Sequence, residues 1–207
     1  MSTKIAATDR KILKTARTMI LEKGILETDM KDIAAAIGMS RSTLYRHFPG
    51  KADILLKLAD EALSIICKAQ TLPSGRKFDT GYDAFAWQMG RMTKAALDHI
   101  EEITFLRDFD CLYGKYCRTE KNDPEGDDHL PALSRISPLK ESFQKGVEDQ
   151  SIRPSKDPEL QVLAIFQSFL AVAERVLPEE AACRSAYGYG REILLSHVRT
   201  LLSAIKS

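Results

Sequence analysis

Basic and hydroxyl side chains gather between Met39 and Lys51, a stretch that contains no Asp or Glu. Guanidinium, ammonium, imidazole and hydroxyl groups donate hydrogen bonds to phosphate oxygens and to the edges of bases. The sequence therefore predicts contacts with double-stranded DNA. The side chains that we expect to make them are those of Arg41, Ser42, Thr43, Tyr45, Arg46, His47 and Lys51.

The charge of the chain is unevenly distributed, although its net charge is only +1. Residues 1–60 carry 11 Lys and Arg against 7 Asp and Glu, whereas residues 61–207 carry 19 against 22. A basic amino-terminal region on a nearly neutral chain directs one face toward phosphate without making the whole surface bind nonspecifically.

Two short helices must position these side chains. The apolar spacing predicts helices over 30–37 and 41–48, the first capped by Thr28 or Asp29 and the second by Ser40. Between them Gly38 supplies a left-handed turn. Two helices joined by a short turn with glycine form a helix-turn-helix, the alternative being an ordinary amphipathic hairpin. Its small core would contain Ile33, Ala34, Ile37, Met39 and Leu44.

Helical spacing continues through the rest of the chain, so we predict an all-α protein. We expect a first helix over 9–23, capped by Asp9, and a fourth over 51–70. A Leu72-Pro73-Ser74-Gly75 segment then separates the amino-terminal head from a helical body. The body helices are expected at 79–98, 101–116, 131–149, 157–176 and 185–205, with a polar loop at 118–129.

Residues 10–58 resemble the N-terminal domain of the TetR family of bacterial transcriptional regulators. The agreement lies at Ala16, Gly24, Thr28, Asp32, Ile33, Ala34, Gly38, Ser40, Thr43, Leu44, Tyr45, Phe48, Lys51 and Leu55. The resemblance implies a subunit of about nine helices. It also implies a DNA-binding domain over 1–50 and a regulatory domain over 51–207, joined by the fourth helix.

The resemblance also implies roles for individual residues. Base edges would be contacted by Arg41, Ser42 and Thr43, and phosphates by Tyr45, His47 and Lys51. Thr28, at the start of the second helix, would likewise contact DNA. The sequence departs from the family pattern at Gly50, where a polar cap is usual, and this change weakens the cap only slightly.

Two apolar stripes near the end of the chain predict a homodimer through a four-helix bundle. A dimer would present two recognition helices to related half-sites. The stripes are Leu160, Leu163, Gln167 and Leu170 on one helix, and Leu194, Val198, Leu201 and Ile205 on the other. The alternative is that they serve only the core of one subunit.

The family resemblance implies a pocket for a small-molecule effector within the body. The aromatic and methionine content of the body favours an apolar or aromatic compound, although such residues are more often plain core. The candidate lining residues are Phe85, Trp87, Met89, Met92, Phe105, Phe109, Tyr113, Phe143 and Phe166.

The sequence offers little for other classes of function. Its four histidines are scattered, and no phosphate-binding glycine loop or metal-ligand spacing occurs, so we expect no enzyme, cofactor or metal site. The cysteines suggest reduced thiols, with a sensor at Cys111 and Cys117 as the alternative. With no apolar run long enough to span a bilayer, we expect a cytoplasmic protein without a membrane partner.

These observations together predict a ligand-responsive transcriptional regulator that binds operator DNA, with repression as the family's habit. The alternative is an all-helical dimeric adaptor or ligand-binding protein that does not bind DNA.

Overall fold

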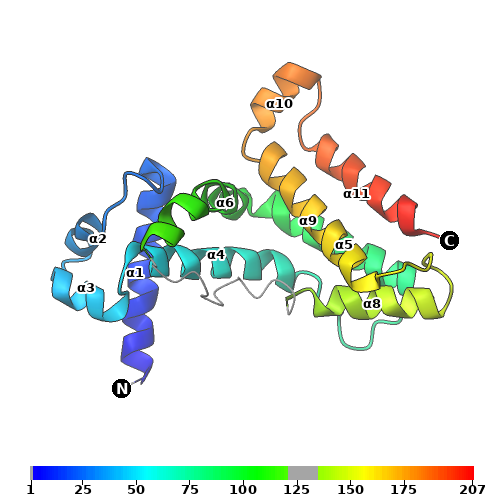
Figure 1. Ribbon diagram of the computed structural model, residues 1–207, viewed down its shortest axis with the longest axis horizontal. Helices are drawn as coiled ribbons and strands as arrows, with labels where there is room; N and C mark the ends of the chain where they lie inside the picture. Colours follow the sequence, from blue (N-terminus) through cyan, green and yellow to red (C-terminus); the bar gives the residue numbers. More distant parts are fainter. Residues whose placement is uncertain (1, 121–134) are drawn as a thin grey trace. The chain divides into compact units, whose positions relative to one another are not determined.

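The computed structural model describes residues 2–120 and 135–207, and every named element within them is an α-helix (Figure 1). The predicted all-α fold is confirmed, with ten helices in the described ranges against an expectation of about nine. The helices are α1 (Ser2–Lys23), α2 (Met30–Ala36), α3 (Arg41–His47), α4 (Lys51–Lys68), α5 (Gly81–Asp98), α6 (Ile100–Glu120), α8 (Ser137–Glu148), α9 (Pro158–Val176), α10 (Glu180–Tyr187) and α11 (Glu192–Ile205).

The chain folds into two compact units. The first contains Met1–Ala62 and Phe105–Leu130, and the second contains Leu63–Thr104 and Pro131–Ser207. Residues 121–134 lie outside the described ranges, and so does most of the polar loop predicted at 118–129. Compactness does not define a functional domain, so the division into domains of residues 1–50 and 51–207 stays a prediction.

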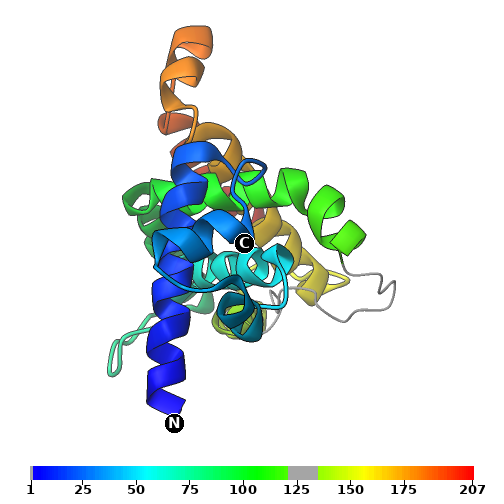
Figure 2. The same ribbon diagram turned by 90° about the vertical axis from the view of Figure 1, so that its left-hand side faces the viewer.

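In the first unit, α1 begins at Ser2, and the predicted start with a cap at Asp9 is wrong. Asp9 lies inside the helix, where its side chain bonds to His47 of α3 instead of to the helix end. Both views show α2 and α3 beside α1, with the first turns of α1 extending past them (Figures 1 and 2). The apolar face of α1 is buried as predicted, at Ile12, Leu13, Ala16 and Ile20.

In the second unit, α5 and α8 pack so closely that their backbones touch. A Cβ atom added to Gly81 would lie within 2.5 Å of the Gly146 Cα, so only glycine fits at this crossing. Farther along the same two helices, the rings of Phe85 and Phe143 meet edge to face at 5.6 Å between centroids. This contact is a favourable arrangement for aromatic pairs in a core.

Two buried glutamine amides hold the beginning of α8 in place. The Gln70 Nε2 donates to the Arg135 carbonyl at 2.6 Å, and the Gln88 Nε2 donates to the Pro138 carbonyl at 3.1 Å. Both glutamines are almost fully buried, and these hydrogen bonds satisfy amide N–H groups that would be costly to bury without a partner.

Helices α9 and α11 pack against each other, and Figure 1 shows α10 at the turn between them. The prediction of one helix over 185–205 is wrong, because α10 ends at Tyr187 and α11 begins at Glu192. Gly188 stops α10 with a left-handed backbone, φ +76°. The Arg153 N–H donates to the Ile205 carbonyl, so the end of α11 lies near the residues that precede α9 and the two helices run antiparallel.

Within the described ranges, no single helix has both the length and the apolar character needed to cross a membrane. Helices α9 and α10 meet that test only as a pair, and the pair is bent by 86°.

Candidate nucleic-acid interface

The turn between α2 and α3 has the geometry that the sequence predicts. Gly38 adopts φ +69°, which side chains disfavour, and the Ser40 Oγ accepts a hydrogen bond from the Thr43 N–H at 3.2 Å as the cap of α3. The predicted small core is buried at Ile33, Ala34 and Leu44, whereas Ile37 and Met39 are half-buried. This core fixes the angle at which α3 leaves α2.

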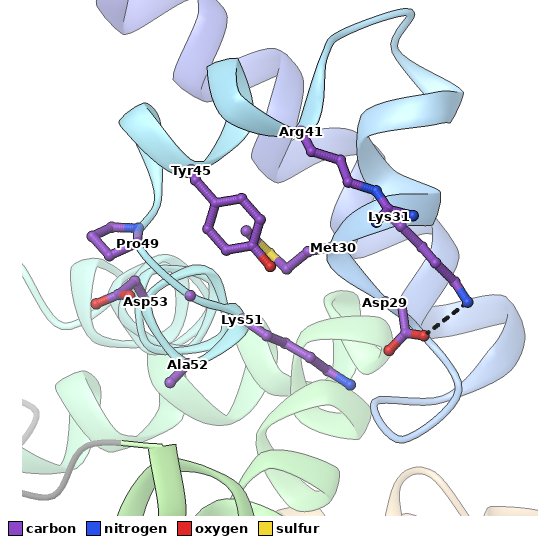
Figure 3. A pocket seen from close by; sticks show the side chains of 10 residues that line it. Asp29, Met30, Lys31, Arg41, Tyr45, Pro49, Lys51, Ala52 and Asp53 are labelled. Carbon is purple, nitrogen blue, oxygen red and sulfur yellow. Dashed lines mark ion pairs between the residues drawn. The ribbon is translucent and has the colours of Figure 1, made fainter.

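A hollow of about 690 Å³ lies where the beginnings of α2 and α4 meet the exposed face of α3 (Figure 3). It brings together Arg41, Tyr45 and Lys51, three of the predicted DNA-binding residues, with Lys31 beside them. The complete lining is Asp29, Met30, Lys31, Arg41, Tyr45, Pro49, Gly50, Lys51, Ala52 and Asp53.

Tyr45 and Arg41 are two of the accessible groups of this hollow. Tyr45 is 49% exposed, and Met30 lines the same hollow. Arg41 is exposed at the first position of α3, and it has no ion-pair partner within the described part of the chain. A tyrosine hydroxyl and an unpaired guanidinium are both suitable donors for phosphate or base oxygens.

Lys51 has a more constrained position than the sequence suggests. Lys51 is only 7% exposed, and its ammonium donates to the Leu26 carbonyl at 3.4 Å. The residue also begins α4, an 18-residue helix whose first N–H groups and dipole favour an anion. The ammonium and the helix start therefore provide positive potential from the same wall of the hollow.

The hydroxyl groups at the start of α3 form a small network. The Ser40 Oγ lies 3.0 Å from the Ser42 Oγ and 2.8 Å from the Thr43 Oγ1, and the Arg46 Nη2 donates to the Thr43 Oγ1 at 3.4 Å. Ser42 and Arg46 are exposed, whereas Thr43 is half-buried. The network holds these side chains in place beside Arg41.

Thr28 and His47 are held by other parts of the first unit. Thr28 is fully buried, and its hydroxyl donates to the Gly24 carbonyl at 2.9 Å. The His47 Nδ1 lies 2.6 Å from the Asp9 Oδ1, with the two side chains 17% and 35% exposed. Neither lines the hollow, so the described geometry separates them from Arg41, Tyr45 and Lys51.

The candidate effector residues do not form one group. Five of them are buried in the second unit. Phe105 and Phe109 are buried in the first unit, where their rings stack at 6.2 Å between centroids. The side chain of Tyr113 lies outside the described residues. Trp87 is half-buried against Arg76 and Phe78. The five buried together are Phe85, Met89, Met92, Phe143 and Phe166.

The candidate dimer residues divide by exposure. Leu160 is 59% exposed and Gln167 is also exposed, whereas Leu163 and Leu201 are half-buried. The remaining four are buried within the chain itself, so they contribute to the core of one subunit. These four are Leu170, Leu194, Val198 and Ile205.

The cysteines differ in their environments. Burial raises the pKa of the Cys67 thiol to about 12, which keeps it protonated and unreactive. Cys183 is also buried and Cys111 is exposed, while the side chain of Cys117 lies outside the described residues. Among the described side chains, no three His, Cys, Asp or Glu residues gather as metal ligands.

Sequence reasoning missed three contributors to this surface. Lys31 and Asp29 form an ion pair at 3.6 Å (Figure 3), and Met30 is a further lining residue of the hollow. Lys31 could have been predicted, because a basic residue in the first turn of a helix next to the basic stretch can reach the same face. Asp9 was interpreted as a helix cap, and nothing local indicates its bond to a residue on α3.

Residues 12–58 match the model of the bacterial regulatory proteins of the tetR family. No curated protein sequence matches the chain. Among solved structures, PfmR, a TetR family transcriptional regulator from Thermus thermophilus, is 21% identical with a TM-score of 0.61, covering 93% of this chain and 97% of PfmR. A TetR family transcription regulator from Marinobacter aquaeolei is 14% identical with a TM-score of 0.63, covering 100% of both chains.

RolR, solved in complex with its ligand resorcinol, is 17% identical with a TM-score of 0.62, covering 99% of this chain and 90% of RolR. At these identities the likeness shows the fold, and the family model supplies the assignment of the amino-terminal region. Residues 12–58 thus match the model of the tetR family of bacterial regulatory proteins, and the all-helical fold of the chain is similar to that of solved TetR family regulators.

Proposed function

We propose that this chain is a transcriptional repressor that binds operator DNA as a homodimer and releases it when a small molecule binds. The observation that carries the DNA-binding part is the hollow beside α3, where an exposed tyrosine, an unpaired arginine and the lysine at the start of α4 converge. Such a set suits DNA, because the tyrosine and the lysine can donate to a backbone phosphate while the arginine beside them can reach base edges.

In this proposal α3 lies in the major groove. Arg41, Ser42 and Thr43 contact base edges, because they occupy the first turn of the helix, and Arg46 contacts the backbone or a base from the exposed face. Tyr45 and Lys51 hold one phosphate in the hollow, and His47 holds another. Thr28 donates its buried hydroxyl to the Gly24 carbonyl, just after α1, rather than to DNA.

The homodimer is proposed to form through the faces of α9 and α11 that the chain itself leaves uncovered. Leu160 and Gln167 provide the exposed part of the predicted stripe on α9, and Leu195, 38% exposed, adds an apolar group on α11. The half-buried Leu163 and Leu201 would complete the contact. A second subunit is needed because one short recognition helix reads too few base pairs for useful specificity.

The effector is proposed to be an apolar or aromatic compound that binds among the buried aromatic and methionine side chains of the second unit. The structural likeness to RolR, which binds resorcinol, supports this class of compound. Binding would favour a conformation with low affinity for the operator. A coupling of about 1–3 kcal/mol would change that affinity about 5- to 150-fold.

We also propose that the protein is cytoplasmic and that it is not an enzyme.

The DNA-binding proposal is tested by replacing Arg41, Tyr45 and Lys51 together with alanine. Since each lost cationic contact costs about 1–3 kcal/mol, we expect affinity for a mixed-sequence DNA duplex to fall about 100-fold. We also expect the slope of log affinity against log salt to decrease by about 0.9 for each phosphate contact removed. Fluorescence anisotropy across a salt series measures both quantities.

A matched control replaces Arg153, Lys156 and Tyr187, which are exposed on the second unit, with alanine. This control removes the same charge and one tyrosine, and we expect it to leave both quantities unchanged. Circular dichroism checks that each variant remains folded. If the Arg41, Tyr45 and Lys51 variant binds DNA like the wild type, the chain is better described as an adaptor or as a protein with a different DNA-binding face.

A further inference from the structure

We propose that Asp9 is a positioning residue for DNA binding, because it orients the imidazole of His47 across the first unit. This inference rests on the proposed function, since it concerns how one of the proposed phosphate contacts is made. Asp9 lies on α1 and His47 is the last residue of α3, yet the Asp9 Oδ1 and the His47 Nδ1 are 2.6 Å apart. A contact of this length is a strong, charge-assisted hydrogen bond.

The chemistry of the pair determines the protons on the ring. An ionised carboxylate only accepts hydrogen bonds, so the Nδ1 of His47 must carry the proton in this contact. The other ring nitrogen, Nε2, is then the one left for a further partner. When the ring is doubly protonated, Nε2 donates to a phosphate oxygen while Nδ1 stays bonded to Asp9.

The surroundings of the pair favour a fixed ring. The His47 side chain is only 17% exposed and that of Asp9 is 35% exposed, so the bond is shielded from water more than an ordinary surface ion pair. An imidazole held at Nδ1 loses less rotational freedom when it binds a phosphate than a free one does. Asp9 therefore fixes the orientation of the His47 ring before DNA binds.

The positioning role of Asp9 can be distinguished from the effect of its negative charge on DNA binding. Removing a negative charge from a DNA-binding face should strengthen DNA binding, because it reduces repulsion from the phosphates. Loss of a positioning residue should weaken it. The two interpretations predict opposite signs for the same substitution.

The experiment measures the affinity of the full-length protein for a mixed-sequence DNA duplex at low salt, since phosphate contacts do not depend on sequence. The variants are Asp9→Ala, Asp9→Asn, His47→Ala and the double variant of Asp9→Ala with His47→Ala. Glu22→Ala is the matched control, because Glu22 is an exposed acid near the other end of α1. Circular dichroism checks the fold of each variant.

We expect Asp9→Ala to weaken DNA binding about 2- to 10-fold, the usual effect of losing one hydrogen bond. Asp9→Asn should recover part of the loss, because its amide oxygen still accepts from Nδ1. In the His47→Ala background the Asp9 substitution should no longer weaken binding, and Glu22→Ala should leave affinity unchanged or slightly raised. A ¹H–¹⁵N spectrum of the imidazole groups should show a protonated Nδ1 for His47, assigned by its absence in His47→Ala.

Unchanged or tighter binding by Asp9→Ala overturns the positioning role, as does an equal loss in the His47→Ala background. An Asp9→Asn variant as weak as Asp9→Ala also overturns it, because the accepting oxygen would then be irrelevant. These results leave the proposed function intact as long as the wild type binds the duplex and His47→Ala weakens that binding. A wild-type protein that binds no duplex overturns the proposed function and this inference together.

Discussion

The arginines of α3 differ from those at the turn between α10 and α11 in whether they pair with acidic side chains. On α3, Arg41 and Arg46 are exposed, and within the described ranges neither forms an ion pair. At the turn between α10 and α11, by contrast, Arg184 and Arg191 both bond to Glu180, with Arg191 at 2.7 Å. Paired cations stabilise a local structure, whereas unpaired ones remain available for an external anion. The comparison therefore supports the proposal that α3 binds DNA, whereas the arginines at the α10–α11 turn have a structural role.

Two glycines are required for different physical reasons. Gly38 in the helix-turn-helix has open space where a Cβ would stand, but its φ of +69° suits glycine. Gly81 at the start of α5 has no such backbone requirement, and a Cβ there would collide with the backbone of α8. Gly38 is thus required by the backbone conformation that aims α3, and Gly81 by the close contact of two helices. Substitutions at these positions test whether the two requirements differ.

The largest expected effect is that of Gly81→Ala in the second unit. Because the new methyl group would meet backbone rather than a flexible side chain, we expect the free energy of unfolding to fall by about 3 kcal/mol or more. Gly90→Ala is the matched control on the same helix, where nothing lies within 4 Å, and it should raise that free energy by about 0.5–1 kcal/mol. Chemical denaturation measures both, and equal effects would contradict the close packing of α5 against α8.

Gly38→Ala should have a smaller effect on stability. The left-handed backbone costs about 1–2 kcal/mol for alanine, and Gly38→Asn should recover part of that cost because asparagine tolerates this conformation. Since the turn orients α3, we expect Gly38→Ala also to weaken DNA binding, which Gly81→Ala should affect only through unfolding. Denaturation and DNA anisotropy on the same samples separate the two effects, and a Gly38→Ala protein of unchanged stability would refute the requirement.

The smallest effect is expected for Glu180→Gln. The Glu180 carboxyl has its pKa lowered from 4.5 to about 2, first by its hydrogen bond from Arg191 and then by that from Arg184. A lowered pKa in the folded state stabilises the protein above pH 4.5, and this stabilisation disappears as the pH falls toward 2. Because the pair is close to solvent, we expect a loss below about 1 kcal/mol at pH 7.

Thermal denaturation of the wild type and of Glu180→Gln between pH 7 and pH 2 checks this prediction. The difference between the two proteins should shrink across the acidic part of that range. A constant difference would mean that packing, rather than charge, gives Glu180 its role.

The helix-turn-helix could be predicted from sequence because its signals are local. The cap at Ser40, the left-handed Gly38 and the buried Ile33 and Leu44 each follow from residue type and spacing within a few positions. The family model matches residues 12–58, the stretch that contains this local pattern. Wherever a short stretch determines its own structure, the sequence was sufficient.

Contacts between distant residues could not be predicted in this way. Asp9 has the residue type of a helix cap, and only the folded chain brings it to His47. Thr28 has the residue type of a phosphate ligand, yet tertiary packing buries its hydroxyl against Gly24. The break at Gly188 is an intermediate case, because the glycine was visible in the sequence while the continued apolar spacing favoured one uninterrupted helix.

The backbone contact between Gly81 and Gly146 also limits how the second unit can move. Two helices in direct backbone contact have no flexible side chains between them to absorb a shift, so we expect α5 and α8 to behave as one mechanical element. Gln88 ties the start of α8 to α5 as well. An effector that enters the second unit would therefore displace α5 and α8 together, and its response would be a switch between discrete packings rather than a gradual widening between these two helices.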